Sequence, residues 1–285
     1  MPMTVDLGKV PDLQECIETA WVDGVKEFKL VNTYRSNTST YALLHIKKHM
    51  SGITIRGSGI LDGGGLASHI IVVEDADATI KGIKISSGNT TDPVRVAKDY
   101  RGRPLRSIFE AIDGAGILVL GKSNVNLDDC RVTDNHSGMC GGSLSNQGTG
   151  LVEVSECVFE DNSAYHTGGA IDNLTHGATI IVKGSEFKNN LSNAGSICGG
   201  PHGQITVFKK TKASLYDNSF SGTTYAIDAA IGSTIDDSGN TYNDKPIKPR
   251  RPGQGGNLVD KSKHAKQLLF FNVHLVRHGL LPFIR

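Results

Sequence analysis

Histidines and aspartates that could carry acid–base chemistry are concentrated between residues 166 and 228: His166, Asp172, His176, His202 and Asp228. A lyase acting on a uronic acid needs a base that removes a proton next to the carboxylate and a cation that stabilises the resulting enolate. A glycoside hydrolase needs two carboxyl groups at a suitable separation. We expect His166, Asp172 and His176 to be catalytic, and His202 and Asp228 to bind substrate. The alternative interpretation is that these short polar residues only form turns.

A basic segment, residues 88–115, supplies the cations that such chemistry would use. It contains Lys98, Arg101, Arg103 and Arg106. Guanidinium groups bind carboxylates through two parallel hydrogen bonds, so the segment suits an acidic polysaccharide. We expect Arg103 and Arg106 to be catalytic, and Lys98 and Arg101 to bind substrate. The alternative is an ordinary solvated surface loop.

A repeat must position these residues. Four times, a large apolar residue is followed three positions later by asparagine, and these asparagines are spaced by 27, 28 and 28 residues. The four pairs are Val132 and Asn135, Phe159 and Asn162, Phe187 and Asn190, and Leu215 and Asn218. A fixed period of this length is typical of a solenoid, in which each repeat packs only against its neighbours.

The runs between these markers favour strands. Residues 151–154, 179–182 and 205–208 are short, rich in branched side chains and bounded by turn-forming residues. Stacking such strands at about 4.8 Å winds parallel sheets into a tube. The four asparagines would then form one ladder of side-chain amides. We therefore predict an all-β fold, a right-handed single-stranded parallel β-helix with an N-terminal capping helix.

The coils resemble the pectin-lyase-like superfamily of right-handed β-helices. The motif Phe159-x-x-Asn162 followed by Gly168-Gly-Ala-Ile171 is similar to the repeat of chlamydial polymorphic outer-membrane proteins. The resemblance implies a carbohydrate-directed β-helix that binds or cleaves an acidic polysaccharide, in an extracellular or cell-surface location. If it is an enzyme, we expect a polysaccharide lyase, with a glycoside hydrolase or an epimerase as the second choice. The alternative is a non-catalytic surface or adhesion β-helix. The Arg-x-Pro-x-x-Arg motif of pectate lyases is not matched, because Gly102 stands where its first arginine would be.

The remaining sequence indicates a cap at one end and a separate tail at the other. Asp12-Leu-Gln-Glu15 is a capping-box pattern, and Leu13, Ile17 and Trp21 recur at helical spacing. Beyond Asp244 the chain is rich in proline, glycine and basic residues. The predicted boundaries are 1–24 for the cap helix, 25–244 for the β-helix with its insertion at 88–115, 245–262 for a disordered basic linker and 263–285 for an apolar, basic tail.

Composition limits the cofactors and partners. The five cysteines show no zinc-binding spacing, so no metal site is predicted, and calcium at the aspartates stays open as the one cofactor considered. Cys130 and Cys157 should stack as thiols in adjacent coils, with a disulfide as the less favoured alternative. We expect no transmembrane segment and no specific nucleic-acid partner, since polar residues interrupt the apolar tail and no recognised module is present. A classical signal peptide is not visible at the start.

Overall fold

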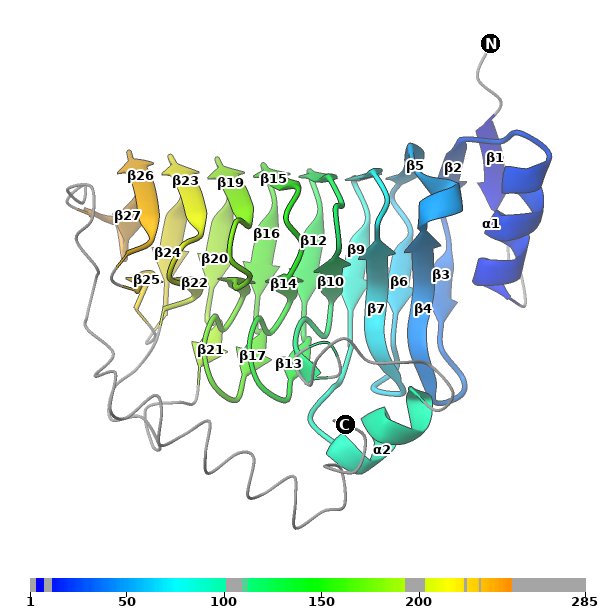
Figure 1. Cartoon of the computed structure of the whole chain (residues 1–285), viewed down its shortest axis with the longest axis horizontal. Coiled ribbons are helices and arrows are strands. Elements are labelled where there is room, and N and C mark those ends of the chain that lie inside the picture. Colours follow the sequence, from blue (N-terminus) through cyan, green and yellow to red (C-terminus); the bar gives the residue numbers. More distant parts are fainter. Residues whose placement is uncertain are drawn as a thin grey trace.

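The computed structural model describes residues 4–7, 12–100, 110, 112–192, 203–222, 225–230 and 232–247. Their strands stack in chain order along the long axis of a tube, with helix α1 (Leu13–Val22) at the N-terminal end (Figure 1). All strand pairs but one are parallel within these residues, the exception being β27 with β28. This is a parallel β-helix, as predicted.

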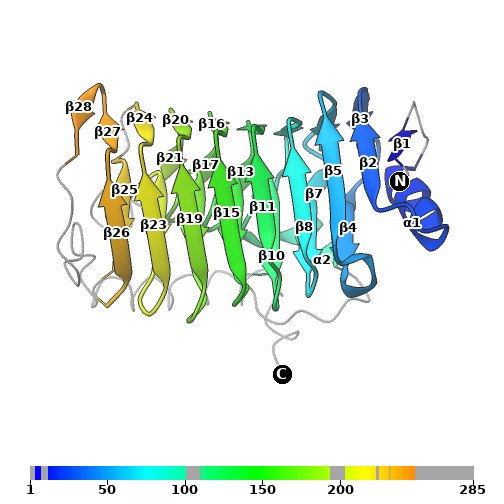
Figure 2. The same cartoon turned by 90° about the horizontal axis from the view of Figure 1, so that it is seen from above.

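Three sheets run the length of the tube, and we name them A, B and C; Figure 2 shows sheet A across the front. Sheet A contains β1 (Thr4–Leu7), β2 (Glu27–Leu30), β5 (Ile53–Gly57), β8 (Ala78–Lys81), β11 (Val125–Asp128), β15 (Leu151–Ser155), β19 (Thr179–Lys183), β23 (Lys212–Tyr216) and β26 (Thr234–Ser238). Sheet B contains β3 (Thr33–Arg35), β6 (Ile60–Asp62), β9 (Lys84–Ser86), β12 (Arg131–Thr133), β16 (Val158–Glu160), β20 (Glu186–Lys188), β24 (Ser219–Ser221), β27 (Thr241–Tyr242) and β28 (Lys245–Pro246). Sheet C contains β4 (Thr40–Lys47), β7 (Ala67–Glu74), β10 (Ile117–Leu120), β14 (Leu144–Asn146), β18 (Ile171–Asn173), β22 (Ile205–Val207) and β25 (Ile227–Ala229). A short fourth sheet contains β13 (His136–Ser137), β17 (Ser163–Ala164) and β21 (Leu191–Ser192).

The interior of the tube is a stack of equivalent apolar side chains. Phe159, Phe187 and Phe220 lie one above another in sheet B, with ring centroids 4.9 and 4.8 Å apart. All three are buried, as are the branched residues that sheets A and C direct inward. The fold is therefore held by contacts between like positions of successive coils, which is the packing that a solenoid requires.

Two rows of polar side chains satisfy the backbone at two corners of the described coils from β11 onward. At the corner after sheet B, the Asn135 amide donates to Asn162 Oδ1 at 3.0 Å, and the Asn162 amide donates to Asn190 Oδ1 at 2.8 Å. The Asn190 amide then donates to Gln204 Oε1 at 2.8 Å. The asparagine ladder is confirmed for its first three members, but its fourth member is Gln204 instead of the predicted Asn218.

Asn218 belongs to the other corner, between sheets A and B. There the residues that accept from the backbone N–H of the preceding coil are Cys157, Ser185, Asn218 and Asn240 in turn. The prediction was wrong for Asn218 because both corners use the same local geometry, a left-handed residue followed by the ladder residue. Asp161 before Asn162 has φ 55°, and Asp217 before Asn218 has φ 54°. The predicted equivalence of Leu215 to Phe159 and Phe187 was wrong for the same reason. Leu215 lies in sheet A opposite Val182, whereas the two phenylalanines lie in sheet B.

The thiols of Cys130 and Cys157 occupy the corner between sheets A and B. The Cys130 N–H donates to Cys157 Sγ at 3.3 Å, and both side chains are buried free thiols. The predicted stacking of these two residues is confirmed. Ser185 follows in the same row, so this corner accepts either a thiol or a hydroxyl.

Helix α1 covers the open end of the first coils. Asp12 caps it by accepting from the Glu15 N–H at 3.0 Å, and Leu13, Ile17 and Trp21 are buried. The Trp21 indole donates to the His49 carbonyl at 2.8 Å, in the short helix η1 (Lys48–Met50). The capping helix is confirmed. Strand β1 precedes it and pairs with β2.

The insertion between β9 and β10 packs on the tube. Its helix α2 (Pro93–Asp99) begins at Asp92, whose side chain accepts from two N–H groups of the first turn. Val96 and Tyr100 are buried against Ile112, Met139 and Cys140. The described part of the insertion thus packs on the outside of the turn that leads into strand β14 of sheet C. None of the described helices is both long and apolar enough to cross a bilayer.

We predict that Asn162→Ala lowers the free energy of unfolding by about 3 kcal/mol or more, because it leaves the buried N–H and amide of Asn135 without their acceptor. Chemical denaturation measures the change. The matched control is Asn126→Ala on the outer face of sheet A, where we expect less than about 0.5 kcal/mol. Equal losses for the two variants would contradict a stabilising function of the ladder.

Candidate functional site

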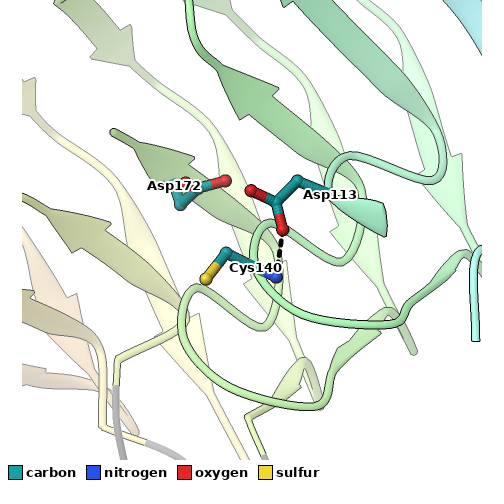
Figure 3. Close-up of side chains that lie close together, drawn as sticks. All are labelled: Asp113, Cys140 and Asp172. Atoms are coloured by element: carbon teal, nitrogen blue, oxygen red, sulfur yellow. Dashed lines mark hydrogen bonds between the residues drawn. The ribbon is translucent and has the colours of Figure 1, made fainter. Parts of the chain in front are cut away.

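Three chemically active side chains converge from successive coils: Asp113, Cys140 and Asp172 (Figure 3). Asp113 and Cys140 occupy equivalent positions just before β10 and β14, while Asp172 is the central residue of β18. One carboxylate oxygen from each aspartate and the Cys140 sulfur lie within 4.8 Å of one another. All three residues are buried. The repeat therefore assembles a cluster that no single coil contains.

Glycine makes room for the cluster. Gly141, directly after Cys140, has φ 62°, which a residue with a side chain rarely adopts. A Cβ at this position would lie 2.2 Å from Asp172 Oδ1. Gly168 repeats the position one coil later, with φ 63°. The Gly-Gly part of the repeat thus serves two purposes, since it turns the chain into sheet C and leaves space for the carboxylate.

The hydrogen bonds within the cluster are unequal. Asp113 accepts from the Cys140 N–H at 2.8 Å and from the Gln147 amide at 3.1 Å. The Thr167 hydroxyl donates to Cys140 Sγ at 3.2 Å. Neither carboxylate oxygen of Asp172 has a hydrogen-bond partner, although the residue is 0% exposed. Buried polar atoms are nearly always paired, so Asp172 is the unusual member.

Burial controls the protonation of the cluster. It raises the pKa of Asp172 to about 8, against a smaller opposing effect of the Ser145 hydroxyl, which lies on the neighbouring rung without meeting hydrogen-bond geometry. Burial and the nearby Asp172 raise the pKa of Asp113 well above its usual range. The pKa of the Cys140 thiol is also raised well above its usual value, by burial and by both aspartates. At neutral pH the cluster therefore holds protons that exposed carboxyl groups would release.

One of the predicted site residues is a member of this cluster, and a second lies next to it. Asp172 is one of its members, and His166 is buried beside it with Nδ1 3.8 Å from Cys140 Sγ. Asp228 lies in the same row of sheet C, with Thr206 on the rung between it and Asp172. The structure thus places Asp172 and Asp228 two rungs apart, and Asp113 is the carboxylate that approaches Asp172. His176 is exposed in the turn after β18 and is not brought to the cluster.

The predicted cationic residues are only partly covered by the structure. Lys98 is exposed near the end of α2. Arg101, Arg103, Arg106 and His202 lie outside the described residues, so their predicted functions stay predictions.

Asp113 and Cys140 were not predicted as site residues. One signal was present in the sequence: Asp113-Gly114, Cys140-Gly141 and Thr167-Gly168 stand at the same position before their strands. The insertion separates Asp113 from the regular period, and this hides its equivalence to the other two. The three side chains also meet because Asp172 lies on the outer face of β18. Its neighbour Ile171 lies on the inner face and packs in the core of the tube.

We predict that Gly141→Ala destabilises the protein more than Gly177→Ala. Both glycines have positive φ, so each substitution costs about 1–2 kcal/mol of backbone strain. Only at position 141 does the new methyl group collide with its surroundings, namely Asp172 Oδ1 at 2.2 Å and the Leu144 carbonyl oxygen at 2.4 Å, which adds roughly 1–3 kcal/mol. At position 177 nothing lies within 4 Å of the added Cβ. Denaturant unfolding of both variants tests this, and equal costs would contradict the close packing of Asp172 and the Leu144 carbonyl over Gly141.

We also predict a dependence of stability on pH that Asp172 carries. The pKa of Asp172 is about 8 in the folded chain, against 3.8 for an ordinary aspartate side chain, so the folded state binds more protons between these values. The stabilisation is therefore fully present below pH 3.8 and is lost as pH rises through about 8. In metal-free buffer, the fall in unfolding temperature over this range should be smaller for Asp172→Asn than for the wild type. The control Asp161→Asn, at an exposed site, should show the same decrease in unfolding temperature as the wild type. If Asp172→Asn also shows the wild-type decrease, the pH dependence does not come from Asp172.

Comparison with known proteins agrees with the architecture. A family model described as "Right handed beta helix region" matches residues 42–241, which is most of the chain. Searches of curated proteins and of solved structures found no significant match. The match spans the tube from β4 to β27, including all three residues of the cluster. The chain therefore belongs to the right-handed parallel β-helix family.

Proposed function

We propose that the protein is a carbohydrate-directed β-helix that binds or cleaves an acidic polysaccharide, with Asp113 and Asp172 as its acid–base pair. The observation that carries this proposal is the approach of two buried carboxyl groups beside the insertion, with raised pKa values. Cleavage of a glycosidic bond by paired carboxyl groups needs one to be protonated and the other charged. With both pKa values raised by burial, the pair reaches this singly charged state as the pH approaches the Asp172 pKa of about 8, so we expect activity on the alkaline side of neutral pH.

The separation of the pair favours one of the two hydrolytic mechanisms. Carboxyl groups are about 5–5.5 Å apart in retaining glycosidases and about 6.5–9.5 Å apart in inverting ones. Oxygens of Asp113 and Asp172 lie within 4.8 Å, which leaves no space for the attacking water of an inverting enzyme. In a hydrolase, this geometry supports a retaining reaction. In a lyase, the base would be Asp172 or His166, and the predicted arginines would stabilise the enolate.

The insertion is the element that would meet substrate. Lys98, predicted to bind substrate, is exposed on α2. It is followed in the chain by Arg101, also predicted to bind substrate, and by Arg103 and Arg106, which are predicted to be catalytic. Val96 and Tyr100, in and directly after α2, pack against Cys140 and cover the cluster. A polysaccharide therefore reaches the two carboxyl groups only when α2 moves away from the tube. Acidic polysaccharides are met outside the cell, so the proposal includes an extracellular or cell-surface location.

A non-catalytic surface or adhesion β-helix is the second candidate. The complete burial of Asp113, Cys140 and Asp172 favours it, because a structural cluster has no need of access to solvent. The corner ladders, which involve every coil from β11 onward, also serve the fold alone. Binding of a polysaccharide without turnover would support this candidate.

We predict turnover of at least one uronic-acid polysaccharide in a panel tested with and without calcium. Reducing-end formation measures hydrolysis, and ultraviolet absorbance of an unsaturated uronate product measures elimination. We expect Asp172→Asn and Asp113→Asn each to lower kcat by about 100-fold or more, as removal of an acid or base does. The control Glu153→Gln, exposed on the outer face of sheet A, should keep wild-type activity. Turnover that survives both aspartate variants would move catalysis away from this pair, and binding without turnover would favour the second candidate.

A further inference from the structure

The Asp113–Cys140–Asp172 cluster is also a set of metal-binding donors. It brings two carboxylate oxygens and one sulfur within 4.8 Å of one another, in a buried position reached from three successive coils. Thiolate, imidazole and carboxylate are the groups that bind zinc in proteins. We propose that this cluster binds a divalent transition-metal ion of the zinc class, with Asp113, Cys140 and Asp172 as its ligands.

The unpaired carboxylate is the strongest argument. Both oxygens of Asp172 are buried without a hydrogen-bond partner, and one of them faces the Asp113 carboxylate (Figure 3) and lies within 4.8 Å of the Cys140 sulfur. An unsatisfied buried polar group in a folded protein calls for an explanation such as a bound ion. A cation between the three side chains would satisfy it. Without a cation, the two carboxyl groups repel each other whenever both are charged.

The neighbouring groups orient the other two ligands as a metal site requires. Asp113 is fixed by the Cys140 N–H and by the Gln147 amide, and each of its oxygens keeps a further lone pair for a metal. The Thr167 hydroxyl donates to the Cys140 sulfur, which is the direction that a thiolate needs. Such second-layer hydrogen bonds hold metal ligands in position and tune their basicity.

The distances suit a small tetrahedral ion after a minor adjustment. Bonds of 2.0–2.3 Å place the ligand atoms of a tetrahedral zinc site about 3.3–3.8 Å apart. The cluster, with a spread of up to 4.8 Å, needs only a small rotation of the aspartates to close around an ion. His166 Nδ1 lies 3.8 Å from Cys140 Sγ but is not one of the donor atoms that all lie within 4.8 Å of one another, so the proposed ligand set has three members.

The donor set selects against calcium and magnesium. Calcium takes six to eight oxygen ligands, and magnesium demands an octahedron of oxygens that usually includes several waters. A buried site with a thiolate and two carboxylates offers neither arrangement. Zinc and cobalt accept sulfur, nitrogen and oxygen together. The three ligands bind in their deprotonated forms, so uptake of the ion must release protons to solvent.

This inference stands without the proposed carbohydrate function. A metal ion would occupy the oxygens that acid–base catalysis uses, so the catalytic proposal applies to the metal-free chain. Binding is measured with the metal alone, in the absence of polysaccharide. Failure of the activity panel therefore leaves the metal result intact, and failure of metal binding leaves the activity panel intact.

The test is a titration of the reduced, chelator-treated full chain with Co²⁺. We expect one equivalent to bind, with visible bands of a tetrahedral ion and a near-ultraviolet charge-transfer band from the thiolate. Zn²⁺ should displace the cobalt, and an excess of Ca²⁺ or Mg²⁺ should not. Cys140→Ser should abolish the charge-transfer band. The control Cys130→Ser should keep it, because Ser185 already fills an equivalent place in the same row of residues.

A second variant guards against a failure of Cys140→Ser to fold. Asp172→Asn keeps the shape of the side chain, and we expect it to weaken cobalt binding by more than the 10–100-fold that loss of a second-layer partner causes. Circular dichroism establishes that each variant is folded. The proposal is overturned if the wild type binds no stoichiometric cobalt, if the charge-transfer band survives Cys140→Ser, or if folded Asp172→Asn binds as tightly as the wild type.

Discussion

The structure depends on one constraint: at two corners of the described coils from β11 onward, the backbone leaves the sheet and its N–H must find an acceptor in the next coil. A side chain of that next coil supplies it, as when Asn162 Oδ1 accepts from the Asn135 N–H. The same amide then continues the row to Asn190. Because an unpaired buried N–H is costly, the acceptor fixes the register of each coil on its neighbour. The stack of phenylalanines follows from this register and adds the apolar contacts that fill the tube.

The sequence was sufficient for the architecture because its period and its strand pattern agree. The 27-residue spacing of Asn135 and Asn162 predicts that they meet, and they do. It was insufficient at Asn218, because two corners share a left-handed residue followed by a polar one, and pattern matching cannot tell them apart. The coil between Phe187 and Phe220 is longer than the preceding ones, so residues 28 positions apart no longer occupy equivalent places. Only the pairing of β20 with β24 shows that Phe220, and not Leu215, is equivalent to Phe187.

The candidate site was predictable in part for a related reason. Asp172 and His166 stand out as polar residues beside a Gly-Gly turn, so their chemistry is visible in the sequence. Asp113 lies in the interrupted coil, and its approach to Asp172 depends on how far the insertion displaces the chain before β10. Whether a strand residue such as Asp172 faces outward is readable from alternation with Ile171. The side chains that Asp172 meets, Cys140 and Asp113, come from the two preceding coils, so the sequence around Asp172 does not reveal them.

The span of the cluster has a consequence for cooperativity. In a solenoid each coil contacts only its immediate neighbours, and such a chain can lose coils one at a time from an end. Asp113 and Asp172 belong to coils that are separated by a third, yet their side chains meet beside Cys140. A contact of this range couples second neighbours, so the coils of β10, β14 and β18 should open together. The middle of the tube would then behave as one indivisible unit, with fraying restricted to the coils on either side.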